Sequence, residues 1–89
     1  PYRPASGSLL RIPVPSPVPV EGTLRVYTAA MEMVFRGRGM SVMELGRNLF
    51  RWDGRREDGS RAGSGVYLFV LETADARLTG KFVLVEGGS

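Results

Sequence analysis

The chain has 89 residues, a formal net charge of +3, and neither Cys nor His. A chain of this length forms one domain around one modest core, so we expect residues 1–89 to fold as a single unit. The absence of thiol and imidazole side chains removes disulfides and the usual zinc ligands and general bases. Its basic side chains are almost all Arg and alternate with acids, a pattern typical of a solvated surface; we do not expect nucleic-acid binding. No apolar stretch approaches the roughly 20 residues that span a bilayer, so we expect no membrane span.

The N-terminal quarter of the chain contains all six prolines, four of them within residues 13–19. Proline lacks the N–H that a sheet needs and fixes φ, so this segment cannot lie in a central strand and should be extended. Residues 8–12 precede it and are expected to form a short edge strand with Leu10 and Ile12 on one face. Because edge strands leave backbone groups unpaired, this segment could pair with the sheet of a neighbour. Its candidate interaction residues are Ser8, Leu9, Leu10, Arg11 and Ile12.

The central part of the chain reads as a series of strands. Residues 23–28 alternate with period two and place Leu24 and Val26 inward. Residues 29–36 fit a helix or a strand, and we favour the strand because Gly37 and Gly39 should stop the run before a stable helix length.

The second half of the chain continues this pattern. Residues 40–46 should form a connection or a weak strand, and residues 48–52 a strand with Phe50 and Trp52 on one side. Residues 66–73 are apolar on both faces, as in a central strand that is covered on both sides. A turn near residues 74–76 and a last strand at 78–86 complete the set. The spacing predicts an all-β fold, an Ig-like (fibronectin III-like) antiparallel β-sandwich of six or seven strands.

A polar, glycine-dense loop joins the strands that carry Trp52 and Tyr67. We expect Trp52 to pack between sheets, Tyr67 to bond a loop carbonyl through its hydroxyl, and Asp53 to accept N–H bonds within its own loop. The glycines at 54, 59, 63 and 65 should supply the unusual backbone angles of a tight loop. The structural residues of this loop are Trp52, Asp53, Gly54, Gly59, Gly65 and Tyr67.

Chemical roles for the loop are less favoured. The acids of the loop lack the ligand spacing of an EF-hand, and three arginines among them would repel calcium, so we expect no metal. The sequence Gly63-Ser64-Gly65 has no His to activate the hydroxyl and no helix after it. No phosphate-binding glycine motif is present. We therefore expect neither an enzyme nor a cofactor.

Residues 52–67 resemble the Ig-like modules of flagellar hook-capping proteins and of type IX secretion C-terminal sorting domains. Those modules read W-D-G-(R/K)-(D/N)-x-x-G-x-x-(V/L)-x-S-G-(V/I)-Y. The matching residues are Trp52, Asp53, Gly54, Arg55, Gly59, Ser64, Gly65, Val66 and Tyr67. Residues 1–4, 24–27 and 81–85 are similar to their opening N-P-(F/Y)-x-P, their L-R-I-Y strand and their closing K-M-V-L-L.

The chain departs from this pattern at three informative positions. Thr28 replaces an Asp and Met31 a Gly in the turn after the L-R-I-Y strand, and Arg56 replaces an acid in the loop. Methionine would be strained at a left-handed turn position, so we expect this turn to shift or lengthen. Since Arg56 reverses a charge, it is a further candidate interaction residue.

The resemblance implies a non-catalytic structural, sorting or assembly module of a secreted or cell-surface bacterial protein. Its partners would be the parent polypeptide or the secretion and surface machinery, and its location extracellular. The sequence begins at Pro1 without Met, so we expect a processed product or a segment of a longer polypeptide.

Two alternatives remain open from the sequence. The chain could be a subunit of an extracellular assembly or filament that self-associates by β-strand addition. It could also bind carbohydrate or nucleic acid through Trp52 and the arginines, which requires an exposed Trp52.

Overall fold

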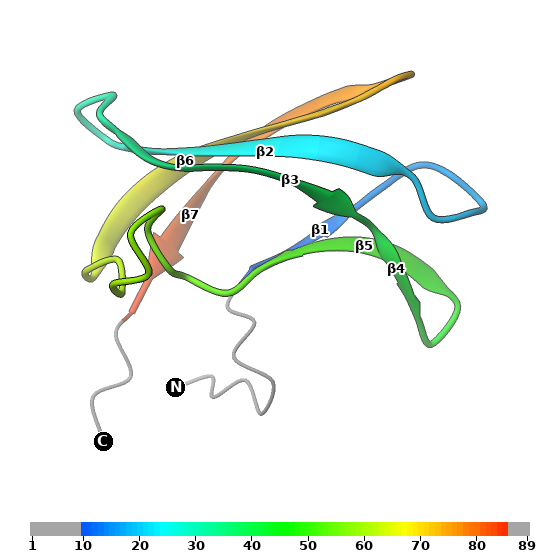
Figure 1. Ribbon diagram of the computed structural model, residues 1–89, viewed down its shortest axis with the longest axis horizontal. Helices are drawn as coiled ribbons and strands as arrows, with labels where there is room; N and C mark the ends of the chain where they lie inside the picture. Colours follow the sequence, from blue (N-terminus) through cyan, green and yellow to red (C-terminus); the bar gives the residue numbers. More distant parts are fainter. Residues whose placement is uncertain (1–9, 86–89) are drawn as a thin grey trace.

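The computed structural model describes residues 10–85 and contains only strands, turns and loops over that range. Seven strands form two antiparallel sheets (Figure 1). They are β1 (Leu10–Pro13), β2 (Glu21–Thr28), β3 (Met33–Met40), β4 (Val42–Glu44), β5 (Arg47–Trp52), β6 (Gly65–Thr73) and β7 (Arg77–Leu84). The prediction of an all-β antiparallel fold is confirmed. The described residues include no helix that could cross a membrane.

The two sheets have the strand orders β1-β5-β4 and β3-β2-β6-β7. In Figure 1 the three-stranded sheet lies below β2 and β3. The buried core contains residues from both sheets, including Ile12 and Trp52 on one side and Val26 and Leu71 on the other. This two-layer packing is consistent with a β-sandwich.

The predicted alternation of β2 is confirmed. Leu24 and Val26 are buried at 1% and 0% exposure, whereas Arg25 and Tyr27 lie on the opposite face and are partly exposed. Central strand β6 differs from the expectation. Its inner residues Tyr67 and Leu71 are buried, but Val66 on the outer face is 43% exposed. Leu68 and Val70 of the outer face are half-buried, so the two faces of β6 are not equally covered.

Strand β3 runs through both glycines that were expected to end it. The aromatic ring of Phe35 lies over Gly37 on the inner face, where an added Cβ would come within 2.6 Å of the ring. The ring takes the space of the missing side chain and covers the backbone, which makes glycine compatible with the strand. The register shifts between the pairs Val26–Phe35 and Tyr27–Met33, so β3 has a bulge at Val34. Val34 and Phe35 both contact the core.

The turn between β2 and β3 neither shifts nor lengthens, in contrast to the prediction. Met31 itself adopts the left-handed conformation, with φ of 69°. The Thr28 hydroxyl accepts hydrogen bonds from the N–H groups of Ala30 and Glu32, both at 3.2 Å. The Thr28 N–H donates to the Glu32 carbonyl at 2.8 Å. These bonds hold the turn closed and offset the backbone strain at Met31.

The region 40–46, expected to be a connection or a weak strand, contains the three-residue strand β4 and a two-residue turn. Leu45 and Gly46 both have positive φ, 50° and 80°, as a type I′ hairpin turn requires. The predicted turn at 74–76 is confirmed between β6 and β7, where the Thr73 N–H donates to the Ala76 carbonyl at 2.8 Å.

Candidate functional site

The loop between β5 and β6, residues 53–64, is anchored by Trp52. The indole is only 3% exposed and contacts the rings of Phe35 and Phe82, with centroids 5.9 and 6.0 Å away. Its Nε1–H donates to the Arg55 carbonyl at 3.1 Å, so the loop backbone satisfies its one polar group. The prediction of a core tryptophan is confirmed, and its ring face is not open to a ligand in this structure.

Backbone hydrogen bonds close the loop itself. The Arg56 N–H donates to the Ser60 carbonyl at 2.7 Å, the Gly59 N–H to the Arg56 carbonyl at 2.9 Å, and the Ala62 N–H to the Gly54 carbonyl at 2.9 Å. Arg56, the candidate interaction residue with the reversed charge, therefore belongs to this turn through its backbone hydrogen bonds. The residue is exposed.

Two of the loop glycines need the freedom that glycine alone has. Gly54 and Gly59 have φ of 82° and 88°, in the left-handed region that other residues avoid. Gly65 also has positive φ, at 154°. Gly63 was predicted to have an unusual angle as well, and this was wrong because its φ is not positive. Its carbonyl has a different role.

Tyr67 closes the far end of the loop as predicted. Its hydroxyl donates to the Gly63 carbonyl at 2.7 Å, and its ring stacks on Phe82 with centroids 5.8 Å apart. The residue is 5% exposed. Tyr67 is thus fixed at both ends, by its ring in the core and by its hydroxyl on the loop.

The loop carboxylates also bond within the loop. Asp53 Oδ1 accepts the Arg55 N–H at 3.1 Å, as predicted. Asp58 Oδ1 accepts the Ser60 hydroxyl at 2.6 Å and the Ser60 N–H at 2.9 Å. These two bonds, with a smaller contribution from the Arg56 charge, lower the pKa of Asp58 from its ordinary value of 3.8. The described residues contain no cluster of three side chains that could hold a metal ion.

Asn48 is a buried polar residue whose contacts the sequence analysis did not predict. It is 6% exposed, and its Nδ2 donates to the carbonyls of Ser16 at 3.0 Å and Val18 at 2.7 Å. The proline-rich segment has few N–H groups of its own, so Asn48 fixes it against β5. The sequence did contain one sign of this role: Asn48 alternates with Phe50 and Trp52 and so lies on the inward side of the strand.

Of the candidate interaction residues near the N-terminus, Leu10, Arg11 and Ile12 lie on strand β1, at the edge of the three-stranded sheet as predicted. Ile12 is 3% exposed and Leu10 packs against the core, so the two share one face. Arg11 is exposed, and its Nε lies 3.2 Å from Glu44 Oε1. Ser8 and Leu9 lie outside the described residues.

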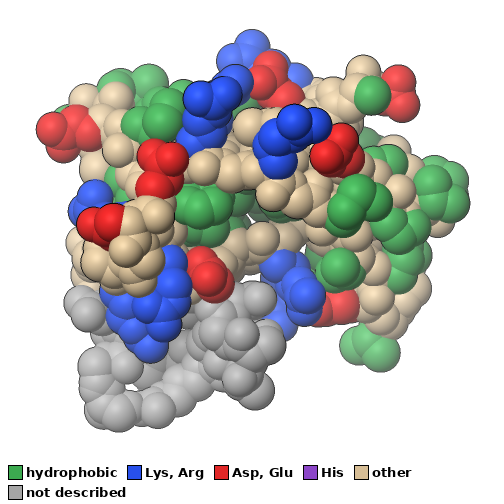
Figure 2. Space-filling model, viewed as in Figure 1, with side chains coloured by type: hydrophobic (Ala, Val, Ile, Leu, Met, Phe, Trp, Pro, Cys, Tyr) green, Lys and Arg blue, Asp and Glu red, His purple; other side chains and the backbone are tan. Residues whose placement is uncertain are grey.

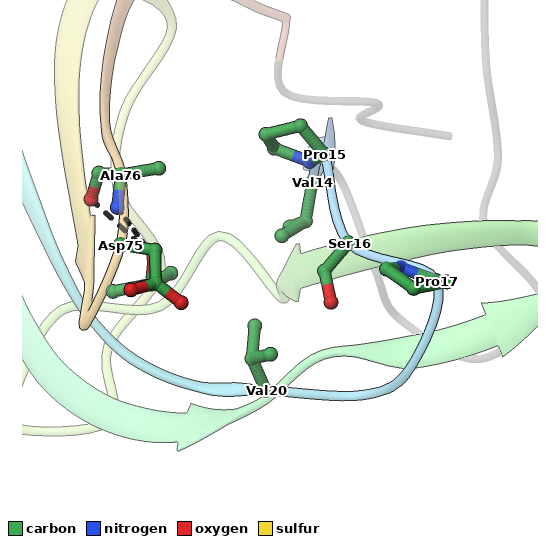
Figure 3. Close-up of a pocket in the computed structure, with 8 residues that line it drawn as sticks. Val14, Pro15, Ser16, Pro17, Val20, Asp75 and Ala76 are labelled. Carbon is green, nitrogen blue, oxygen red and sulfur yellow. Dashed lines mark hydrogen bonds between the residues drawn. The ribbon is translucent and has the colours of Figure 1, made fainter.

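A hollow of about 220 Å³ lies between the proline-rich segment and the β6–β7 turn (Figure 3). Eight residues line it: Val14, Pro15, Ser16, Pro17, Val20, Thr73, Asp75 and Ala76. Asp75 is the one ionisable side chain among them, and the Ser16 hydroxyl donates to the Val18 carbonyl at 2.9 Å.

Comparisons with known proteins add no assignment to this geometry. The chain matches no protein-family model, no curated protein and no solved structure. The class that the coordinates define is therefore an all-β domain of two antiparallel sheets with an internally bonded β5–β6 loop.

Proposed function

We propose that this chain is an Ig-like, non-catalytic structural, sorting or assembly module of a secreted or cell-surface bacterial protein. The observation that carries the proposal is the closure of the β5–β6 loop. The aromatic residues of the resemblance, Trp52 and Tyr67, are buried, and both donate hydrogen bonds to carbonyls of the loop that they enclose. A motif used in this way maintains a shape and does not present a reactive group.

The burial of Trp52 also bears on the ligand-binding alternative. Stacking a sugar or a base needs an accessible ring face. At 3% exposure, with Phe35 and Phe82 against the ring, the indole has none. We therefore do not propose carbohydrate or nucleic-acid binding through this residue.

The sorting role can be tested by fusion. Residues 1–89 are joined to the end of a fluorescent protein with a secretion signal and expressed in a bacterium that has type IX secretion. We expect fluorescence at the cell surface or in the medium, since the folded module is the recognised element. The matched control carries Trp52→Ala, which destroys the core under the loop. Retention of both fusions in the periplasm would contradict the sorting role.

A second candidate, self-association by strand addition, is favoured by one observation. Strand β1 lies at the edge of the three-stranded sheet, where β5 is the one described strand that pairs with it. Light scattering over a wide concentration range tests it. A mass that rises with concentration supports assembly, and a constant monomer mass contradicts it.

A further inference from the structure

The described sheets have four edge strands, β1, β4, β3 and β7. Strand β3 spans eight residues, as β7 does, against four in β1 and three in β4, and it lies at the edge of the four-stranded sheet next to β2. No other described strand pairs with its free side. Strand β1 ends in Pro13, which lacks an N–H, whereas β3 contains no proline. Of these two edges, β3 is therefore the better template for an added strand.

The backbone groups at this edge can be assigned from the ladder. The Ser41 N–H donates to the Val20 carbonyl at 2.9 Å, in the same register that pairs Gly22 with Gly39. Hydrogen-bonded and non-bonded pairs alternate in an antiparallel ladder. Arg36 and Arg38 therefore belong to non-bonded pairs, and their N–H and C=O groups point to the open side.

The side chains of the same two residues lie on the outer face of the sheet. Arg36 is directly opposite Arg25, and pairs of this non-bonded type bring side chains close together. Like charges in this arrangement are unfavourable. Glu72 neutralises Arg25, with Nη1 to Oε1 at 2.6 Å, but no described carboxylate pairs with Arg36.

Arg38 is only weakly neutralised. Its Nη2 lies 3.2 Å from Glu21 Oε2, with the two side chains 73% and 61% exposed. Exposed pairs of this kind contribute little. Figure 2 shows Lys and Arg atoms beside Asp and Glu atoms over β2 and β3. The open edge thus combines unpaired backbone groups with positive charge.

This charge pattern selects among the possible occupants. In a β3–β3 pair of two copies, the central registers would set Arg36 or Arg38 of one copy against the same residues of the other. That pairing is repulsive. A strand with carboxylates on its outer face would instead relieve the repulsion between Arg25 and Arg36 and complete the ladder.

We propose that the β3 edge binds, by strand addition, an extended partner segment with acidic side chains at alternate positions. The partner backbone pairs with Arg36 and Arg38, and its carboxylates face their guanidinium groups. On the inner face the alternating residues of the segment are small or apolar, because they lie beside Phe35 and Gly37. This inference rests on the edge and its charges and does not require the proposed function.

The test uses a short fluorescent peptide in which Glu and Val alternate, and a second peptide in which Lys replaces Glu. Binding is measured by fluorescence anisotropy at low and high salt. We expect the Glu/Val peptide to bind and the Lys/Val peptide not to bind, with affinity that falls as salt rises. Combining Arg36→Glu with Arg38→Glu should weaken binding by about tenfold or more.

The matched control is Lys81→Glu, an exposed cation on β7 at the opposite edge of the same sheet. It should leave peptide binding unchanged. Equal losses in the Lys81 and Arg36/Arg38 variants would overturn the proposal, as would failure of the Glu/Val peptide to bind at millimolar concentration. Light scattering could instead detect a dimer of the chain that the Arg36→Glu and Arg38→Glu substitutions abolish. That result would assign the β3 edge to a second copy and would also overturn the proposal.

Discussion

The β5–β6 loop and the β3 edge both carry arginines and glycines, but they use them in opposite ways. In the loop, backbone N–H groups and carboxylates bond within the loop, as in the Arg56–Ser60 and Ala62–Gly54 pairs. At the edge, the backbone of Arg36 and Arg38 has no described partner and the Arg36 guanidinium no described carboxylate. The density of polar residues is therefore similar in the two regions, and they differ in whether those residues have internal partners. Our proposal of an interaction surface at the β3 edge rests on that difference.

The strongest challenge to the structural role of the loop is Trp52→Ala. Removing a buried indole should lower the free energy of unfolding by about 3–5 kcal/mol, because it leaves a cavity beneath the loop. Urea denaturation measures the effect. Val83→Ala, at a site that is 67% exposed, is the control and should cost much less. A loss in Trp52→Ala no larger than in the control would mean that the loop does not depend on its anchor.

Tyr67→Phe sharpens the comparison at one bond. It removes the hydroxyl that donates to the Gly63 carbonyl and keeps the ring, so the free energy of unfolding should fall by about 1 kcal/mol. Tyr27→Phe is the matched control, because Tyr27 lies on the outer face of β2 and no hydrogen bond of its hydroxyl is part of the loop. Similar losses of unfolding free energy in both variants would show that the hydrogen bond to Gly63 does not contribute to the stability of the fold.

Arg36→Glu tests the edge, and here we expect a gain. The new carboxylate faces Arg25 in a close cross-strand pair, which should raise the free energy of unfolding by about 0.2–1 kcal/mol at low salt. High salt should reduce the gain. Lys81→Glu on β7 faces Leu68 and should gain less. Destabilisation by Arg36→Glu would mean that Arg36 already has a favourable partner in the folded chain.

Ser60→Ala probes the smallest effect, the lowered pKa of Asp58. Without the Ser60 hydroxyl, that pKa should rise toward 3.8, as followed by NMR titration of the carboxyl group. Because the pKa is lowered in the folded state, ionised Asp58 stabilises that state at pH values above the ordinary pKa. This stabilisation is lost as the pH falls through the folded-state pKa. The variant should show a weaker acid-range dependence, because the N–H of residue 60 still donates to Asp58. Thr79→Ala on β7 should leave the titration unchanged, and an unshifted pKa in Ser60→Ala would contradict the assignment.

The sequence predicted those features that depend on local pattern. Alternation placed Leu24 and Val26 inward, and the flanks of the loop identified Trp52 and Tyr67 as its anchors. The Ig-like assignment and the cell-surface location stay predictions.

The features that the sequence did not predict depend on contacts between distant positions or on special turn geometry. Gly37 remains within a strand because the Phe35 ring covers it, and Asn48 is needed because the proline-rich segment crosses over it. Met31 accepts a left-handed angle because Thr28 closes the turn. The open edge at β3 follows from strand order, which alternation within one strand does not specify.

The central claim is that the loop is closed by its own hydrogen bonds and the β3 edge is open. Amide hydrogen exchange followed by NMR tests it most directly, first in the free protein and then with the Glu/Val peptide. The amides of Arg56 and Ala62 should be protected in both states, whereas those of Arg36 and Arg38 should exchange quickly and become protected when the peptide is added. Protected edge amides in the free protein, or peptide-induced protection in the loop instead of at β3, would contradict the account.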